Sequence, residues 1–323
     1  MAPSGNTRLS PHAHMEHWTN ELGPSEINST LETDADHQLM VIPENMEEEL
    51  HRLGASSDMI FHLKEDDEMV HLPMPGNLDR SIRTEALRCM FNMLQAHPLG
   101  TSSWFQAALL FDRSAASKSF CLEKLPLTCT CLTGIALKCD FATWLDSTQN
   151  CVTAAVSNRT VSQHEKKVLE ALDFRVVAPC VLRWCQTYFT RFGLLASRDF
   201  QLPLQQMHGT VLMFARAVVM CVPASPMLSH GKLAAGLFSL SLVFSGLLPM
   251  ASLMPSSMSV AEWTALFAAT PPAVTMRLMD MMCLAVMEKP DVIRAWSRHA
   301  VEALSESLQQ VLIFQGQQGA RKA

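Results

Sequence analysis

Four charged residues lie within apolar segments of the sequence, where an isolated charge would be costly to bury. Glu165 falls on the same helical face as valine and leucine residues three, four and seven positions away. Lys138 lies at the end of a helical face on which small and apolar residues recur every three or four positions. Arg88 and Asp112 are embedded in the apolar runs LRCMF and LLFDR. Such charges become tolerable when each one has a partner. The pattern therefore predicts that these side chains pair with other groups.

Glu165 and Lys138 also have local explanations, and Arg88 and Asp112 could pair with each other. Ser162 and Glu165 have the S-x-x-E spacing of a capping box, which satisfies two free amides at the start of a helix. Lys138 lies near the end of its expected helix, where a cation is mildly favoured. Arg88 and Asp112, on neighbouring helices, would form a buried structural ion pair. The pattern alone leaves both kinds of explanation open.

The sequence contains no catalytic motif that we can identify. The spacings G-x-x-x-x-G-K, G-x-S-x-G and H-E-x-x-H are missing, and the 12 histidines have no paired ligand spacing. The ten cysteines include no C-x-x-C pair, and most adjoin leucine, valine or methionine. They are expected to be reduced core thiols, which is typical of a cytosolic or nuclear protein. We therefore expect neither an enzyme, a cofactor nor a metal site.

Composition predicts a folded body behind an acidic leading segment. The chain has 323 residues, of which 48% are hydrophobic and 17% are charged, so a large apolar surface must be buried. Residues 1–80 hold 16 of the 31 acidic residues and four of the 25 basic ones. Their net charge is therefore −12, and that of the remaining residues is +6. Residues 1–76 show no sustained period apart from a short helix near 45–53, and we expect a mostly disordered acidic extension.

In the body, residues that end helices recur at regular intervals, which is typical of an all-α protein. Helical periods predict two series of five helices each. The first series is 80–96, 103–115, 122–139, 158–172 and 179–192, and the second is 204–221, 230–248, 260–268, 272–287 and 292–312. Residues 233–248 are apolar throughout but end at Pro249 after 16 residues, too short for a membrane span. We therefore expect a buried helix there and no membrane partner.

The four charged residues, together with Leu127, match the signature of the cyclin box. LRCMFNMLQAH resembles its first helix, WFQAALLFDR its second, LTCTCLTGIALKCD its third and SQHEKKVLEALDF its fifth. The signature Arg, Asp, Leu, Lys and Glu then fall on Arg88, Asp112, Leu127, Lys138 and Glu165. Downstream, MHGTVLMFARAVV, HGKLAAGLFSLSLVFSGLLP and SVAEWTALFAATPPAVTMRLMDMM resemble a second cyclin fold.

This resemblance implies two tandem five-helix cyclin folds, at 77–176 and 177–315, followed by a tail at 316–323. It also implies a function: cyclins bind and activate cyclin-dependent serine/threonine kinases. Lys138 and Glu165 would contact the kinase around its helix C. Arg88 and Asp112 would form the internal pair that fixes the first helix against the second, and Leu127 would pack beneath. The expected place of action is the nucleus or the cytoplasm.

The family also has a docking groove on its first helix for Arg-x-Leu motifs of substrates and inhibitors. The matching apolar positions here are Leu87, Met90, Phe91 and Leu94. The family's Trp is missing and Met93 replaces the usual Asp, so plain core packing is an equal alternative.

A second class of function stays open alongside kinase activation. The chain could be a cyclin-fold interaction or transcription-associated protein that binds a partner and activates nothing. Basic residues in the body are spread singly, with Lys166-Lys167 and Arg321-Lys322 as the adjacent pairs, so we expect no nucleic-acid partner.

Overall fold

The computed structural model describes residues 42, 44–69, 78–97, 100–117, 119–140, 158–196, 201–222, 229–248 and 272–322. Within these ranges the chain is helical and contains no strand, which confirms the all-α prediction. The helices are α2 (Glu44–Arg52), α3 (Ser57–Met69), α4 (Arg80–Leu94), α5 (Gly100–Ala115), α6 (Leu125–Asp140), α8 (Asn158–Ala171), α9 (Val181–Leu195), α10 (Gln201–Cys221), α11 (His230–Phe244), α13 (Pro272–Val286) and α14 (Pro290–Lys322). A 3-10 turn, η2 (Leu122–Lys124), precedes α6. The helix expected at 260–268 lies outside the described residues.

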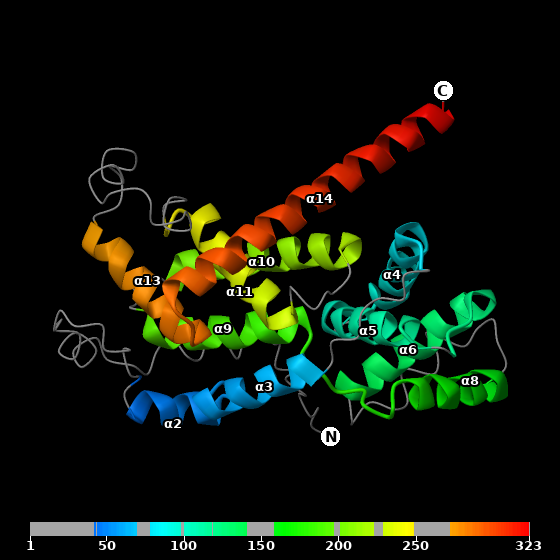
Figure 1. Ribbon diagram of the computed structural model, residues 1–323, viewed down its shortest axis with the longest axis horizontal. Helices are drawn as coiled ribbons and strands as arrows, with labels where there is room; N and C mark the ends of the chain where they lie inside the picture. Colours follow the sequence, from blue (N-terminus) through cyan, green and yellow to red (C-terminus); the bar gives the residue numbers. More distant parts are fainter. Residues whose placement is uncertain are drawn as a thin grey trace, which may run out of the picture.

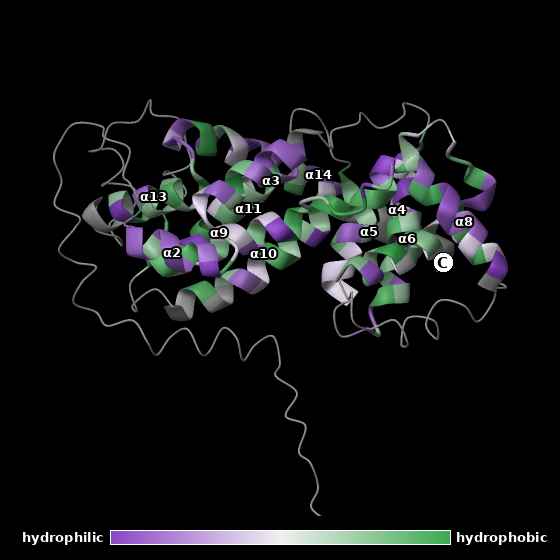
Figure 2. Cartoon of the chain, turned by 90° about the horizontal axis from the view of Figure 1, so that it is seen from below, coloured by the Kyte–Doolittle hydropathy of each residue, from purple (hydrophilic) through white to green (hydrophobic). Residues whose placement is uncertain are grey.

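The helices fall into two groups along the long axis (Figure 1). One group contains α4, α5, α6 and α8, and the other contains α9, α10, α11, α13 and α14. Helix α9 was expected at the end of the first series, but it packs against α10, α11 and α13 of the second. One continuous apolar core runs through both groups. Figure 2 colours much of α5, α6 and α11 hydrophobic and much of α8 hydrophilic.

Helix α11 is the buried helix that the uncharged run predicted. Ser229 caps its start, with the Ser229 Oγ accepting a hydrogen bond from the Lys232 amide at 3.3 Å. Most of its side chains are buried, including polar Ser239 and Ser241, whose hydroxyls bond to carbonyls in the preceding turn. No helix among the described residues is both long and apolar enough to span a bilayer. The lack of an exposed face on α11 therefore reflects its central position between α9, α10 and α14.

Part of the expected acidic extension is folded onto the second helix group. Helix α2 corresponds to the short helix expected near 45–53, whereas α3 was not expected, so the prediction of a mostly disordered segment is wrong for Ser57–Met69. The buried Arg191 of α9 donates hydrogen bonds to the Ala55 carbonyl at 2.8 Å and to the Leu284 carbonyl at 3.2 Å. Lys64 forms a 2.6 Å ion pair with Glu288. These contacts tie α2 and α3 to α9 and to the end of α13.

Asp67 makes a buried polar contact with the start of α11. Its carboxylate accepts a 2.8 Å hydrogen bond from the Gly231 amide, in the first turn of α11, and lies 4.0 Å from the His230 ring. A carboxylate at this position satisfies an amide that the helix itself leaves free and interacts favourably with the helix dipole. Helix α3 therefore serves as a cap for α11.

We expect Asp67→Ala to lower the free energy of unfolding by about 2 kcal/mol, because a buried amide of α11 loses its acceptor. Amide exchange in α2 and α3 should also become faster, since their docking is weakened. The matched control is Asp66→Ala, which removes an exposed carboxylate from the same helix. Equal exchange rates in the two variants would contradict the capping role of Asp67.

Candidate functional site

Lys138 and Glu165 lie together at the surface between α6 and α8. The Lys138 Nζ donates a hydrogen bond to the Glu165 Oε1 at 2.6 Å. The side chain of Lys138 is 45% exposed and that of Glu165 is 20% exposed. An ammonium has three donors and a carboxylate has two oxygens, so each group keeps bonding capacity after this pair forms. The two side chains thus present a preformed polar site to solvent.

The capping explanation for Glu165 is wrong. Helix α8 begins at Asn158, so Ser162 lies in its second turn and cannot cap its first amides. Lys138 does lie in the last turn of α6, where a cation is favoured. The direct pair is therefore what holds the Glu165 carboxylate in place.

The side chains beneath this pair are buried and apolar. Cys131 of α6 is buried and its thiol contacts the Val161 carbonyl of α8 at 3.6 Å. Burial raises the pKa of Cys131 to about 12; the Glu165 charge adds to this effect, and the Lys138 charge opposes it. Leu127, near the start of α6, is half-buried and packs against the main core. Because the buried side chains between α6 and α8 are apolar here, the two charges lie at the surface edge of the contact between these helices.

The buried ion pair between the first two helices of the body involves Arg83, not Arg88. Arg83 of α4 is 1% exposed, and its guanidinium meets the Asp112 carboxylate of α5 twice, at 2.7 and 2.8 Å. Such a bidentate pair satisfies both carboxylate oxygens. Arg88 lies partly exposed on another face of α4 and bonds to Glu85 at 3.3 Å. The predicted Arg88–Asp112 pair is therefore wrong, although Asp112 has the expected role.

Arg83 also links the two helix groups. Its Nη1 donates to the Val219 carbonyl at 2.9 Å and to the Met220 carbonyl at 3.3 Å, in the last turn of α10. Carbonyls at a helix end lack partners within the helix, so Arg83 satisfies groups that would otherwise be buried and free. A second contact between the groups joins Arg80 of α4 to Glu306 of α14.

The predicted docking patch on α4 belongs to the core. Leu87, Met90 and Leu94 are almost completely buried, so they cannot contact a docked peptide unless the helices move. Phe91 is half-buried, with its ring edge against Trp104 and the Arg216 guanidinium 4.9 Å from its centre. This outcome corrects the groove interpretation in favour of core packing.

The sequence reasoning missed two exposed apolar side chains that follow α8. Phe174 is 64% exposed and Val177 is 80% exposed. Their segment is held in place, because the Gln106 amide donates to the Val176 carbonyl at 2.7 Å and Arg113 donates to the Arg175 carbonyl. The signal was present in the sequence: apolar residues continue past Leu172, beyond the expected end of the helix. Exposed apolar groups on a fixed segment are typical of an interaction surface.

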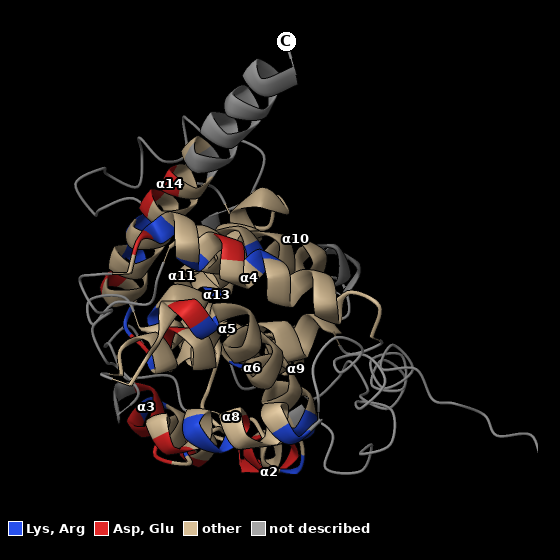
Figure 3. Ribbon diagram, turned by 90° about the vertical axis from the view of Figure 1, so that its right-hand side faces the viewer, with Lys and Arg blue, Asp and Glu red and all other residues tan. Residues whose placement is uncertain are grey.

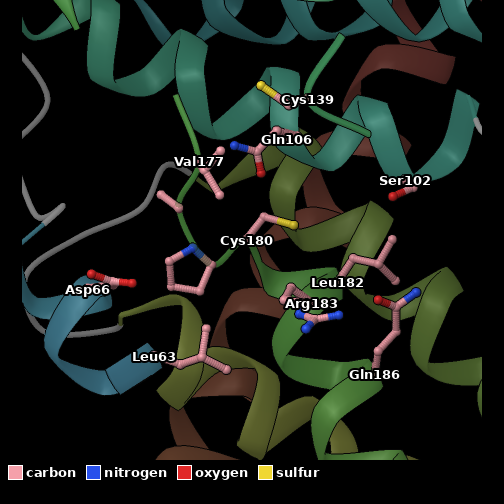
Figure 4. Close-up of a pocket in the computed structure, with 12 residues that line it drawn as sticks. Leu63, Asp66, Ser102, Gln106, Cys139, Val177, Cys180, Leu182, Arg183 and Gln186 are labelled. Atoms are coloured by element: carbon pink, nitrogen blue, oxygen red, sulfur yellow. The ribbon is translucent and has the colours of Figure 1, made fainter. Parts of the chain in front are cut away.

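A cleft of about 380 Å³ opens beside this segment, where the two helix groups meet. Figure 4 shows the side chains that line it, which come from α3, α5, α6 and α9 and from the segment before α9. Leu63 and Asp66 come from α3, Gln106 from α5, Cys139 from α6 and Arg183 from α9. Cys139 directly follows Lys138, so the cleft adjoins the α6 end of the candidate site. The described residues contain no cluster of three metal-ligating side chains.

Comparisons of the chain with protein-family models and with curated protein sequences found no significant match.

Proposed function

We propose that the chain is a cyclin, a regulatory subunit that binds and activates a cyclin-dependent serine/threonine kinase. The Lys138–Glu165 pair carries this proposal. The resemblance assigns both residues to the kinase contact, and the chain brings them to 2.6 Å from each other although 27 positions separate them. Both groups are accessible and retain bonding capacity for a partner.

The helix order supports the proposal of two tandem cyclin folds. Helices α4, α5, α6 and α8 follow the order of the first fold, and α9, α10, α11 and α13 follow that of the second. Arg83 takes the role that the resemblance assigned to Arg88, since it fixes α4 against α5 through Asp112. The first fold would comprise residues 77–176 and the second 177–315.

The proposed mechanism is a population shift in the kinase. The cyclin binds the kinase state in which the catalytic Lys–Glu pair and the metal-binding Asp are assembled. The Lys138 ammonium would donate to carbonyls or carboxylates near the kinase helix C, and Glu165 would accept from amides or cations there. Val177, which lines the same cleft as Cys139 next to Lys138, would add exposed apolar area to this surface. Such a subunit would act in the nucleus or cytoplasm, with the kinase rather than the cyclin performing the chemistry.

The charge-swapped variant Lys138→Glu/Glu165→Lys tests this surface. Because the two groups contact each other, the swap preserves their attraction within the chain while reversing the charges offered to a partner. We expect the affinity for the cognate cyclin-dependent kinase to fall about 30-fold or more, equivalent to about 2 kcal/mol. Affinity is measured by titrating a panel of purified kinases, with thermal unfolding as the check of fold.

A second ion pair with the same residue types and distance provides the control. Lys64→Glu/Glu288→Lys swaps the 2.6 Å pair between α3 and the end of α13, and we expect it to leave kinase affinity unchanged. Undiminished kinase binding by the Lys138/Glu165 swap would reject the assigned surface. Binding without an increase in histone or polymerase-tail phosphorylation would instead favour an interaction protein that activates nothing.

A further inference from the structure

Tertiary packing gathers a histidine and two lysines beside the α6–α8 contact. The Thr128 hydroxyl of α6 lies 2.9 Å from the His164 Nε2 of α8. Lys124 ends the η2 turn four positions before Thr128, and Lys167 follows His164 by three positions on α8. Residues three or four positions apart in a helical segment share a face. One lysine therefore flanks the Thr128–His164 bond from each helix.

The hydrogen bond determines which ring nitrogen of His164 can act as a donor. Thr128 is almost completely buried, and a buried hydroxyl needs an acceptor for its proton. The Thr128 hydroxyl and the His164 Nε2 bond to each other, so Nδ1 is the ring nitrogen that remains for a further partner. When the ring is protonated, Nδ1 carries an N–H that can donate to an anion.

The two lysine charges disfavour the charged form of His164 in the free protein. Partial burial lowers the pKa of His164, and the Lys124 and Lys167 charges lower it further. Both lysines are exposed, so an anion can reach them from solvent. A bound anion would relieve the repulsion and would add charge-assisted hydrogen bonds.

We propose that Lys124, His164 and Lys167 form a binding site for the phosphate group of a phosphorylated polypeptide. A phosphomonoester offers about two negative charges and three acceptor oxygens, which matches two ammonium groups and one imidazole N–H. This site does not depend on the proposed kinase-regulatory function.

The surrounding charges favour a single phosphate over a nucleic-acid backbone. Glu123 precedes Lys124, and Glu170 lies one turn beyond Lys167 and within 3.9 Å of Lys166. Carboxylates thus interrupt the basic surface on both sides, whereas a nucleic acid needs a continuous series of cations. Helix α8 thus carries both basic and acidic residues, whereas α2 and α3 are mainly acidic (Figure 3).

The test uses the full chain and the pentapeptide Gly-Gly-phosphoserine-Gly-Gly, with the unphosphorylated peptide for comparison. The His164 ring signals are assigned by NMR from their loss in His164→Gln. We expect the phosphopeptide to raise the pKa of His164 by about 1, because the bound anion opposes the two lysine charges. Lys124→Ala/Lys167→Ala should weaken binding about tenfold or more. The control Lys166→Ala/Lys289→Ala removes the same charge at exposed positions and should change affinity less than twofold.

Three outcomes would overturn the proposal. The first is an unchanged His164 pKa or equal binding of the unphosphorylated peptide. The second is an equal effect of sulfate at matched ionic strength, which would indicate an adventitious ion only. The third is tighter binding of a single-stranded oligonucleotide than of the phosphopeptide, with the same dependence on the two lysines.

Discussion

Asp112→Ala is expected to lower the free energy of unfolding by about 3–5 kcal/mol, because it leaves the Arg83 guanidinium buried without its counter-charge. Arg83 is 1% exposed and cannot reach solvent without disrupting its contacts to the Val219 and Met220 carbonyls. The loss therefore affects α4, α5 and the end of α10 together. Urea unfolding followed by circular dichroism measures the effect.

Two variants separate this effect from a general loss of charge. Glu85→Ala removes the exposed partner of Arg88 on the same helix and should cost less than about 0.5 kcal/mol. Arg83→Met/Asp112→Leu removes both buried charges and should recover much of the loss, since no unpaired charge remains. A double variant less stable than Asp112→Ala would contradict this account, as would a large effect of Glu85→Ala.

Gly236→Ala should destabilise the protein by about 2 kcal/mol. Gly236 lies where α11 meets α14, and a Cβ there would be 2.5 Å from the Trp296 carbonyl oxygen and 2.8 Å from the Ala300 Cβ. Both helices would have to separate to admit one methyl group. Helix propensity favours alanine over glycine by about 1 kcal/mol, which is too little to offset this clash. Thermal unfolding measures the net change.

Gly209→Ala is the matched control on α10. Its position is exposed, and a Cβ there would meet no atom within 4 Å. The propensity gain then stands alone, and this variant should be more stable than the wild type by about 0.5–1 kcal/mol. If Gly236→Ala stabilises the protein as Gly209→Ala is expected to do, then α11 and α14 approach each other less closely than the geometry indicates.

The helical periods and the residues that end helices were sufficient to predict most helices of the body. The run between Lys232 and Pro249 predicted a buried helix, and α11 is central to the second group. Helix α3 could not be found in this way, because its sequence has no clear apolar face. Helix α3 is held by contacts with residues far away in the sequence: Asp67 bonds to the Gly231 amide, and Lys64 pairs with Glu288. Contacts across more than 150 positions leave no local pattern in the sequence.

The partner of Asp112 also could not be predicted from local sequence patterns. Arg83 and Arg88 are five positions apart on α4, so their side chains project about 140° apart around the helix. The apolar neighbours of Arg88 made it the better candidate by pattern. Arg83 is instead the residue that faces Asp112 and the end of α10. The direction of α5 and α10 relative to α4 is set by packing, which no local spacing encodes.

Local sequence patterns predict the all-α class, most helix positions and the unusual placement of Lys138, Glu165 and Asp112, because these follow from periods of a few residues. Which charges meet depends instead on how the helices pack. Packing joins Lys138 to Glu165 across 27 positions and pairs Asp112 with Arg83. It also places Leu87 and Met90 in the core, which was one of the two alternatives for these residues. Burial and pairing depend on which helix faces pack together, and that choice is made by the core as a whole.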